Sequence, residues 1–293
     1  MKIGLVGLGR MGGAMARRLL SQGYELAVFH PNPQQTTAFA ALGASIARDL
    51  AELCHGRELL ISALPSDESL ESVTLGPGGV IDSLAPAAMH MVTGTHGVPI
   101  MEKLVAAHER ARQVLLSCPL LGRPERAAAG TLGLIAAGPA AAIARITPVL
   151  KSLTEHIFLA GDNPLSAVAI KIANNFVLGC AIEAMGEGMA LVRRYGVDAE
   201  LFREVLTQGL FNCTAYQVYG DVIAKQDWGR VGAAASVGLK DARLALQAGE
   251  RARVPLPSGQ VWHDHLASAC ERGEAALDWS VMAREQFRRS GLE

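Results

Sequence analysis

The sequence has few aromatic residues and no excess of charge of either sign. Only 5% of its 293 residues are aromatic, whereas 50% are hydrophobic and 19% are charged. Lys and Arg number 27 against 28 Asp and Glu, so the formal net charge is −1. This balance argues against a basic nucleic-acid-binding protein and a polybasic membrane-surface protein, and the apolar content argues against disorder. Abundant Ala, Gly and Leu favour closely packed helices over a β-sandwich.

The sequence also lacks paired cysteines and an unbroken apolar run. Its five cysteines are widely spaced and odd in number, so we expect no disulfide framework and no metal site, but reduced and mostly buried thiols. The first residues lead directly into an apolar run without the regions of a signal peptide. Three glycines and a proline interrupt the longest charge-free stretch, residues 127–144, which argues against a membrane span. We predict a soluble, cytoplasmic protein.

Short apolar runs alternate with amphipathic stretches in the first half of the chain. Residues 3–6 and 59–63 are nearly continuously apolar, as strands are when a sheet is covered on both faces. The helical pattern of residues 12–22 lies between strand-like residues 2–6 and 25–29, and further strand-like runs follow at residues 89–93 and 114–116. This alternation is typical of βαβ units and predicts a doubly wound parallel sheet.

After residue 161 the strand-like runs disappear and helical periodicity continues to the end. Residues 166–194 form one stretch without proline, which as a helix would be ~43 Å long. We expect this helix to connect two domains and to reach a second subunit. The predicted fold is an α/β Rossmann domain, residues 1–161, followed by a smaller all-α domain, residues 162–293.

A glycine-rich turn follows the first predicted strand and opens a helix. It reads Gly7-Leu8-Gly9-Arg10-Met11-Gly12, which fits G-x-G-x-x-G. In this context Gly7 permits the tight turn, Gly9 lets the backbone approach a pyrophosphate, and Gly12 lets helix and strand pack closely. Free N–H groups at the helix start would bind the anion. The turn predicts a dinucleotide site.

The end of the second predicted strand carries neither of the usual cofactor-selecting signals. It reads Phe29-His30-Pro31-Asn32-Pro33, with no acid for the ribose of NAD and no Arg for the 2′-phosphate of NADP. Nothing there repels a phosphate, and His30 and Asn32 could donate to one, so the corner favours NADP over NAD. Alternatively, His30 and Asn32 only shape a proline-rich turn.

Lys171 and Asn175 lie four residues apart on the predicted long helix and therefore share one face. Their neighbours are mostly apolar, and burial would lower the pKa of a lysine from ~10.4 towards the range of a useful acid or base. Asn175 could hold a hydroxyl or carbonyl and orient Lys171. The alternative is a lysine that reaches solvent along the helix surface.

Three other polar groups have a structural and a functional interpretation. Residues 238–241 open a further predicted amphipathic helix, which places Asp241 near its positive amino-terminal end, and the alternative is a helix cap with an ordinary surface charge. Arg123 lies in a loop, residues 122–126, that could present backbone N–H groups and a guanidinium to a carboxylate, or be an ordinary charged loop. His263 and His265 do not share a helix face, which argues against a metal site.

Four stretches taken in order resemble the β-hydroxyacid dehydrogenase family, which includes 3-hydroxyisobutyrate dehydrogenase, and the nucleotide domain is similar to that of 6-phosphogluconate dehydrogenase. They are residues 7–16, 119–132, 171–175 with Glu183-Ala184, and Lys240-Asp241. The resemblance covers essentially the whole chain. It implies hydride transfer between NAD(P) and a small β-hydroxyacid or its aldehyde, in a homodimer or homotetramer.

The resemblance also implies the roles of individual residues. Lys171 would be the catalytic acid/base and Asn175 would bind substrate and align it. Backbone around Leu121, Gly122 and Arg123 would hold the substrate carboxylate. Leu64, Pro65 and Thr95 would line the cofactor. Lys240 would lie close to both the nicotinamide and the substrate.

Two departures affect the substrate that we expect. The family's Ser-Gly-Gly is Leu121-Gly122-Arg123 here, and the Ser of its Ser-Thr pair is Gly94. A lost hydroxyl and a gained guanidinium would change which acid is held. The alternatives are an imine reductase, whose members commonly lack a lysine at position 171, and a nucleotide-binding homologue that has lost the reaction.

Overall fold

The computed structural model describes residues 1–293 and divides into two compact units, Met1–Lys171 and Ile172–Glu293. The division falls ten residues after the position expected from the sequence. It lies inside one continuous helix, α9, Pro164–Arg194, which begins two residues before the predicted one. Each unit is described separately below.

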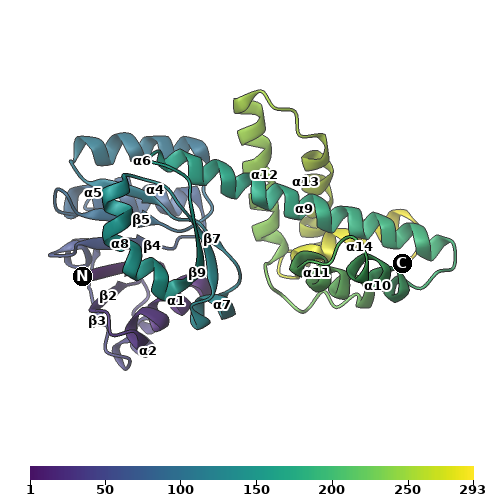
Figure 1. The fold of residues 1–293 in the computed structure, drawn as a ribbon, viewed down its shortest axis with the longest axis horizontal. Coiled ribbons are helices and arrows are strands. Elements are labelled where there is room, and N and C mark those ends of the chain that lie inside the picture. The colour runs from purple at the N-terminus through teal and green to yellow at the C-terminus, as the bar shows by residue number, and fades with distance from the viewer. The chain divides into compact units, whose positions relative to one another are not determined.

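The first unit is built on a six-stranded sheet in the order β3-β2-β1-β4-β5-β6, with every neighbouring pair parallel. β1 and β4 lie at its centre, and their residues are fully buried because helices cover both faces (Figure 1). The predicted doubly wound sheet is confirmed. The strands are β1 Ile3–Val6, β2 Leu26–Phe29, β3 Ser45–Ile46, β4 Leu59–Ser62, β5 Met89–Val92 and β6 Val114–Ser117.

Two apolar clusters hold helices against the two faces of this sheet. Met15 of α1 and Ile146 of α8 belong to the cluster that contains Leu5, whereas Leu53 and Val80 belong to the cluster on the opposite face. The amphipathic spacing in the sequence anticipated this two-sided burial. The helices are α1 Arg10–Ser21, η1 Pro33–Gln35, α2 Thr37–Ala40, α3 Leu50–Cys54, α4 Asp67–Leu75, α5 Val80–Ser83, α6 Val98–Arg110, α7 Pro124–Ala129 and α8 Ala140–Leu153.

A second, three-stranded sheet in the first unit was not predicted. It has the order β7-β8-β9, with β7 Leu120–Leu121, β8 Leu132–Ala136 and β9 Thr154–Leu159. β7 runs antiparallel to β8, and β8 runs parallel to β9. β7 is too short to show a pattern, and β9 exposes Phe158 and Leu159, so neither has the alternation from which a strand is predicted.

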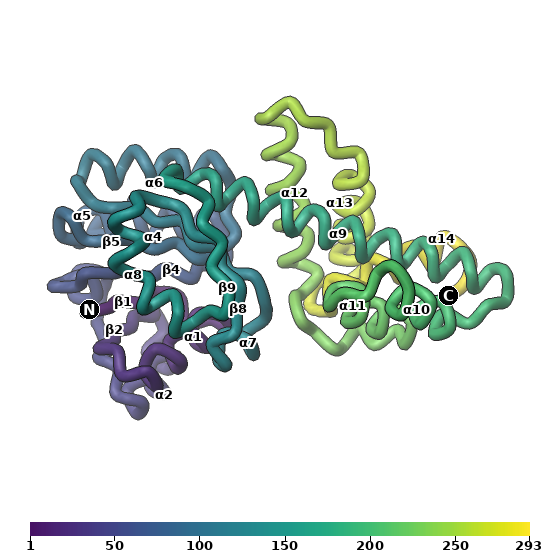
Figure 2. The backbone as a smooth tube through the Cα atoms, viewed as in Figure 1, coloured from purple at the N-terminus to yellow at the C-terminus, as the bar shows by residue number.

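The second unit is entirely helical apart from one isolated bridge, as predicted. α12 and α13 lie side by side in the backbone trace (Figure 2). Trp262 and Trp279 meet edge to face at 6.3 Å in its core, and Gly179 and Gly238 permit this packing because a Cβ would clash with these rings. The helices after α9 are α10 Ala199–Gln208, α11 Thr214–Lys225, α12 Ala235–Ala252, α13 Pro257–Ala269, η2 Cys270–Glu274, η3 Trp279–Val281 and α14 Met282–Arg289.

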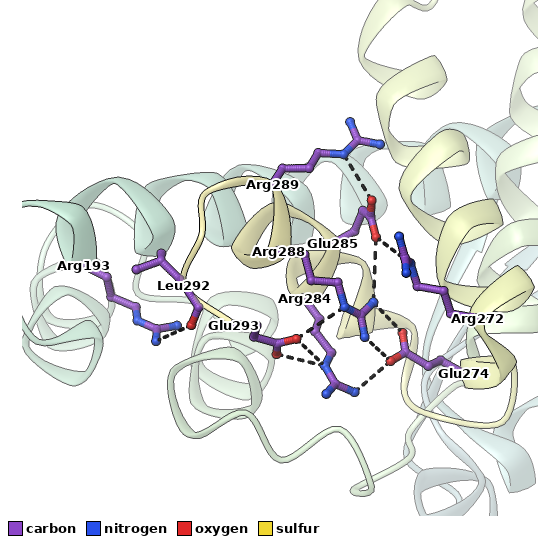
Figure 3. Close-up of polar contacts among 9 residues, drawn as sticks. All are labelled: Arg193, Arg272, Glu274, Arg284, Glu285, Arg288, Arg289, Leu292 and Glu293. Carbon is purple, nitrogen blue, oxygen red and sulfur yellow. Dashed lines mark hydrogen bonds and ion pairs between the residues drawn. The ribbon is translucent and has the colours of Figure 1, made fainter.

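Charged groups anchor the carboxyl-terminal helix α14 (Figure 3). Glu274 accepts hydrogen bonds from Arg284 and from Arg288, and its own side chain is only 10% exposed. Glu293 pairs with the same two arginines. Because both arginines share both carboxylates, this is a network rather than a set of isolated surface pairs.

By length and composition α9 is the one helix that could span a membrane. It nevertheless carries the buried Glu183, which accepts a hydrogen bond from His265 of α13 at 2.7 Å. This buried hydrogen bond shows that α9 packs against α13 inside the second unit at this point. The five cysteines are free, but only Cys54 and Cys118 are buried and Cys213 is exposed, so the expectation of mostly buried thiols was wrong.

Candidate active site

The glycine-rich turn joins β1 to α1 at the carboxyl edge of the parallel sheet. Gly7 has φ +94°, and a Cβ there would clash with the Ala63 carbonyl oxygen. A Cβ at Gly12 would clash with the Gly7 carbonyl oxygen, so this position also needs glycine. These two contacts hold the turn against the loop after β4.

Gly9 differs from these two glycines because no atom lies within 4 Å of the position its Cβ would take. It is the N-cap of α1, and no side chain caps the helix. The first N–H groups of α1 therefore face an open, glycine-lined space, the arrangement that binds a pyrophosphate. In the same turn Leu8 is buried, Met11 is half-buried and Arg10 is exposed. The residues fit a dinucleotide.

Two neighbouring loops end at the same edge of the sheet. Leu64 and Pro65 follow β4, and Thr95 follows β5. Ser66 caps α4 by a capping box with Ser69, which fixes the end of the first loop. Because all six strands are parallel, these loops lie at the edge of the sheet where the glycine-rich turn lies. The strand order reverses between β1, which precedes that turn, and β4, which precedes the first of these loops.

His30 and Asn32 are held inside the turn after β2. The backbone N–H of Asn32 donates to Nδ1 of His30 at 3.0 Å, and Oδ1 of Asn32 accepts from Gln34 N–H at 3.0 Å. Nδ1 of His30 also lies 3.2 Å from the carbonyl oxygen of Asn32, so the ring is held inside the turn in either tautomer. The two side chains thus shape the turn, while Nδ2 of Asn32 remains a donor.

Lys171 lies in the second turn of α9 and is half-buried. Its Nζ donates to the carbonyl oxygen of Leu120 at 2.8 Å, which fixes the amine beside the segment that continues through Leu121, Gly122 and Arg123. Gly122 has φ +138°, a conformation that favours glycine, and Arg123 is the N-cap of α7. Lys171 therefore does not follow the alternative of a lysine extended along the surface.

Asn175 lies one helical turn after Lys171, in the second unit, and is buried. Its Nδ2 donates to Oδ2 of Asp241 at 2.7 Å, and its Oδ1 accepts from Nδ2 of Asn174 at 3.2 Å. The other oxygen of Asp241 pairs with Nζ of Lys240 at 3.0 Å. Asp241 thus joins Asn175 to Lys240.

The interpretation of Asp241 as a helix cap was wrong. α12 begins at Ala235, so Asp241 lies in its second turn, and only 7% of it is exposed. Sequence reasoning missed its position between Asn175 and Lys240, because 66 residues separate Asp241 from Asn175. The Lys240-Asp241 dipeptide was the one available signal.

Sequence reasoning also missed a buried polar chain in the first unit. Gln113 Nε2 donates to the carbonyl of Leu84 and its Oε1 lies 2.8 Å from Nδ1 of His108. His108 Nε2 lies 3.0 Å from His90 Nδ1, and His90 Nε2 lies 2.9 Å from Ser62 Oγ. Because the Gln113 oxygen only accepts, each imidazole carries its proton on Nδ1 and Ser62 donates to His90.

Burial keeps both histidines of this chain neutral. It lowers the pKa of His108 to about 4, and it lowers the pKa of His90 well below its usual value, with the neighbouring His108 adding to the effect. Ser62 ends β4, directly before the loop that contains Leu64 and Pro65. This row of hydrogen-bonded side chains is buried and ends at Ser62, so it fixes the start of that loop.

Comparisons with known proteins cover both units. Residues 2–161 match the NAD binding domain of 6-phosphogluconate dehydrogenase. Residues 166–285 match the family described as NAD-binding of NADP-dependent 3-hydroxyisobutyrate dehydrogenase. The chain belongs to the β-hydroxyacid dehydrogenase family. It is an NAD(P)-dependent oxidoreductase, as the resemblance in the sequence predicted.

Individual relatives match over most of their length. The uncharacterized oxidoreductase YfjR of Bacillus subtilis is 37% identical over 97% of this chain and 99% of its own. The 3-hydroxyisobutyrate dehydrogenase of Pseudomonas aeruginosa is 35% identical over 74% of this chain and 72% of its own. The structure of the Mycobacterium tuberculosis 3-hydroxyisobutyrate dehydrogenase with L-serine is 26% identical and covers 97% of this chain and 98% of its own, with a TM-score of 0.88.

Proposed function

We propose that the enzyme oxidises a small β-hydroxyacid, or reduces the corresponding aldehyde, with Lys171 as the acid/base. The observation that carries the proposal is the hydrogen bond from Lys171 Nζ to the Leu120 carbonyl, which holds the amine beside the Leu121–Arg123 segment. A group that exchanges a proton with a substrate oxygen must lie within hydrogen-bond reach of it. The Leu120 bond orients the amine for that exchange.

NAD or NADP supplies the hydride chemistry when bound. The turn from Gly7 to Gly12 would hold its pyrophosphate, and Leu64, Pro65 and Thr95 would line the rest of it. In oxidation Lys171, as the neutral amine, takes the hydroxyl proton as the carbinol hydrogen leaves with its electron pair. In reduction Lys171, as the ammonium, returns a proton to the carbonyl oxygen. In each direction one proton moves between the substrate oxygen and Lys171, and one hydrogen moves with its electron pair between the substrate carbon and the nucleotide.

The second unit would contribute the groups that hold the reacting oxygen. Asp241 and Asn174 fix both ends of the Asn175 amide, which leaves the second Nδ2 hydrogen of Asn175 for a substrate oxygen. Asp241 also pairs with Lys240, which we assign to the substrate and nicotinamide. Fixing these donors before substrate arrives lowers the cost of orienting them during the reaction.

We expect NADP to be preferred to NAD. No carboxylate lies in the turn from Phe29 to Pro33, and Nε2 of His30 and Nδ2 of Asn32 could both donate to a 2′-phosphate. The ratio of kcat/KM with NADPH to that with NADH measures the preference. A ratio below one would reverse it and leave the reaction unchanged.

We also expect a cytoplasmic homodimer or homotetramer. Apolar side chains of α9 remain exposed in the isolated chain, among them Ile170, Val177 and Leu191, and no segment of the chain covers them. An apolar stripe of this length normally packs against another helix. Light scattering would measure the assembly.

The experiment that tests the reaction is the Lys171→Ala variant, assayed with short hydroxyacids and semialdehydes and with both nucleotides. We expect turnover to fall by ~10²–10⁴ while nucleotide binding, followed by nicotinamide fluorescence, is nearly unchanged. Lys151→Ala, at an exposed position on α8, is the matched control and should keep full turnover.

Three results would contradict the proposal in different ways. Near-normal turnover in Lys171→Ala would remove this residue from the acid/base role. Activity of the wild type on cyclic imines with none on hydroxyacids would identify an imine reductase. Nucleotide binding without turnover on any acid, aldehyde or imine would indicate a homologue that has lost the reaction.

A further inference from the structure

His96 and Asp67 connect the two loops that follow β4 and β5. Nδ1 of His96 lies 2.9 Å from Oδ1 of Asp67, and only 1% of the His96 side chain is exposed. Because an ionised carboxylate only accepts, Nδ1 carries the proton and donates it to Asp67. The Asp67 carboxylate also accepts the backbone N–H of Gly97 at 3.1 Å. The first residue of α4 is thus tied twice to the loop after β5.

Gly94 is required by the position of the His96 ring. A Cβ at residue 94 would overlap Nε2 of His96 and would lie 2.8 Å from the carbonyl oxygen of Leu64. Gly94 does not have a positive φ, so the reason for glycine here is space and not backbone conformation. The imidazole of His96 occupies the space that a side chain at residue 94 would fill. The Leu64 carbonyl oxygen borders the same space.

We propose that His96, held by Asp67, is a positioning residue for the nicotinamide cofactor, and that Gly94 is coupled to it. The pair holds the Leu64–Pro65 loop and the Thr95 loop at a fixed separation. The inference rests on the proposed function, which assigns both loops to the cofactor. It explains why this chain has glycine in place of the Ser expected at position 94: the imidazole and a side chain at 94 cannot occupy the same space.

A double-mutant cycle on the intact enzyme tests the coupling. Gly94→Ala pushes the ring from its place and His96→Ala removes it, so each should raise the dissociation constant for NADPH ~10-fold. In the double variant no ring remains to be displaced, and the new methyl group can shift from the Leu64 carbonyl into the space that the ring leaves. We therefore expect its dissociation constant to stay ~10-fold above that of the wild type, whereas independent effects would multiply to ~100-fold.

A conservative variant and a matched control separate positioning from general destabilisation. His96→Asn keeps a side-chain N–H that can reach Asp67, and should recover most of the NADPH affinity lost in His96→Ala. Glu71→Gln removes the charge from the exposed ion pair with Lys103, 2.8 Å long, which also joins α4 to α6 but lies at the surface. It should leave NADPH binding unchanged, and the KM for the organic substrate should move little in any variant.

The outcomes are distinct. Multiplicative effects in the cycle, or an unchanged dissociation constant in folded His96→Ala, would overturn the role of the pair and leave the proposed reaction intact. If Gly94→Ala does not fold, the comparison of His96→Ala with His96→Asn decides: equal NADPH affinities would overturn the role. A wild type that binds neither NADPH nor NADH would overturn the proposed function, and this inference with it.

Discussion

The phosphate-binding turn of the first unit and the Asn175–Asp241–Lys240 cluster of the second unit are built in opposite ways. The turn consists of six consecutive residues, and the groups that we propose for the pyrophosphate are its backbone N–H groups. The cluster joins α9 to α12 through one buried carboxylate, and its groups are side chains. A backbone site depends on which side chains are kept out of it, whereas a side-chain site depends on charge and on the partner of each group. Mutations can test this difference directly.

The largest effect is expected for Gly9→Asp. No atom lies within 4 Å of the added Cβ, so the fold should persist, but a carboxylate in that open space would block and repel a pyrophosphate. We expect binding of both NADH and NADPH, measured by fluorescence titration, to be lost.

Gly9→Ala is the control, because a methyl group fits the same space without charge. It should weaken nucleotide binding much less than Gly9→Asp. Retained nanomolar-to-micromolar binding in Gly9→Asp would show that the turn does not contact the cofactor.

Asp241→Asn tests the side-chain cluster. The new amide oxygen can still accept from Asn175, but the negative charge opposite Lys240 is gone. We expect kcat/KM for the organic substrate to fall by ~10–100-fold, and the NADPH dissociation constant to change less than threefold.

The half-buried Asp221 on α11 provides the matched control for this variant, since it pairs with the exposed side chains of Lys225 and Arg230. Asp221→Asn should keep wild-type kinetics. If Asp241→Asn also did so, Asp241 would only support the packing of α12 against α9.

The same contrast explains what the sequence could predict. The glycine-rich turn can be recognised from its neighbours in the sequence, because a strand precedes it and a helix follows it. The four central strands can be recognised because they are nearly continuous apolar runs. Lys171 and Asn175 are one turn apart on a helix that is long enough to be recognised without tertiary information. The strands and the long helix were predicted close to their observed positions, whereas the roles of the residues on them stay predictions.

The features that sequence reasoning missed depend on residues far apart in the chain. Asp241 meets Asn175 across 66 residues, and His90 meets Ser62 across 28. β7 has two residues and pairs with a strand that begins eleven residues after its own end. A single sequence shows neither such pairs nor the register of so short a strand, because both are set by tertiary packing.

Glu274→Gln tests a side-chain network that serves stability alone. The substitution removes the charge that faces Arg284 and Arg288, both of which are about one quarter to one third exposed. We expect the free energy of unfolding, from urea titration, to fall by about 2 kcal/mol, because these guanidinium groups are partly desolvated.

Arg48, whose side chain is 87% exposed beside Glu52, is the comparison for an isolated surface pair. Arg48→Ala should have no measurable effect on unfolding. Equal effects of the two substitutions would mean that the sharing of carboxylates around Glu274 adds nothing.

The last test concerns pH, to which the glycine turn is insensitive and the Ser62–His90–His108–Gln113 chain is not. The folded protein holds the pKa of His108 at about 4, whereas the unfolded chain takes up this proton near pH 6.5. Between these values the unfolded state binds more protons, so stability must fall as the pH falls. His108 alone should lower the free energy of unfolding by about 2 kcal/mol between pH 7 and pH 5, and His90 should add to this loss.

His108→Asn should lower stability at pH 7 but flatten the pH profile of the free energy of unfolding. The control His55→Asn, at an exposed position, should keep the wild-type slope. Urea unfolding at half-unit pH steps measures the slopes. A wild-type slope in His108→Asn would show that other groups control the acid sensitivity and that His108 takes up its proton as readily in the folded state as in the unfolded state.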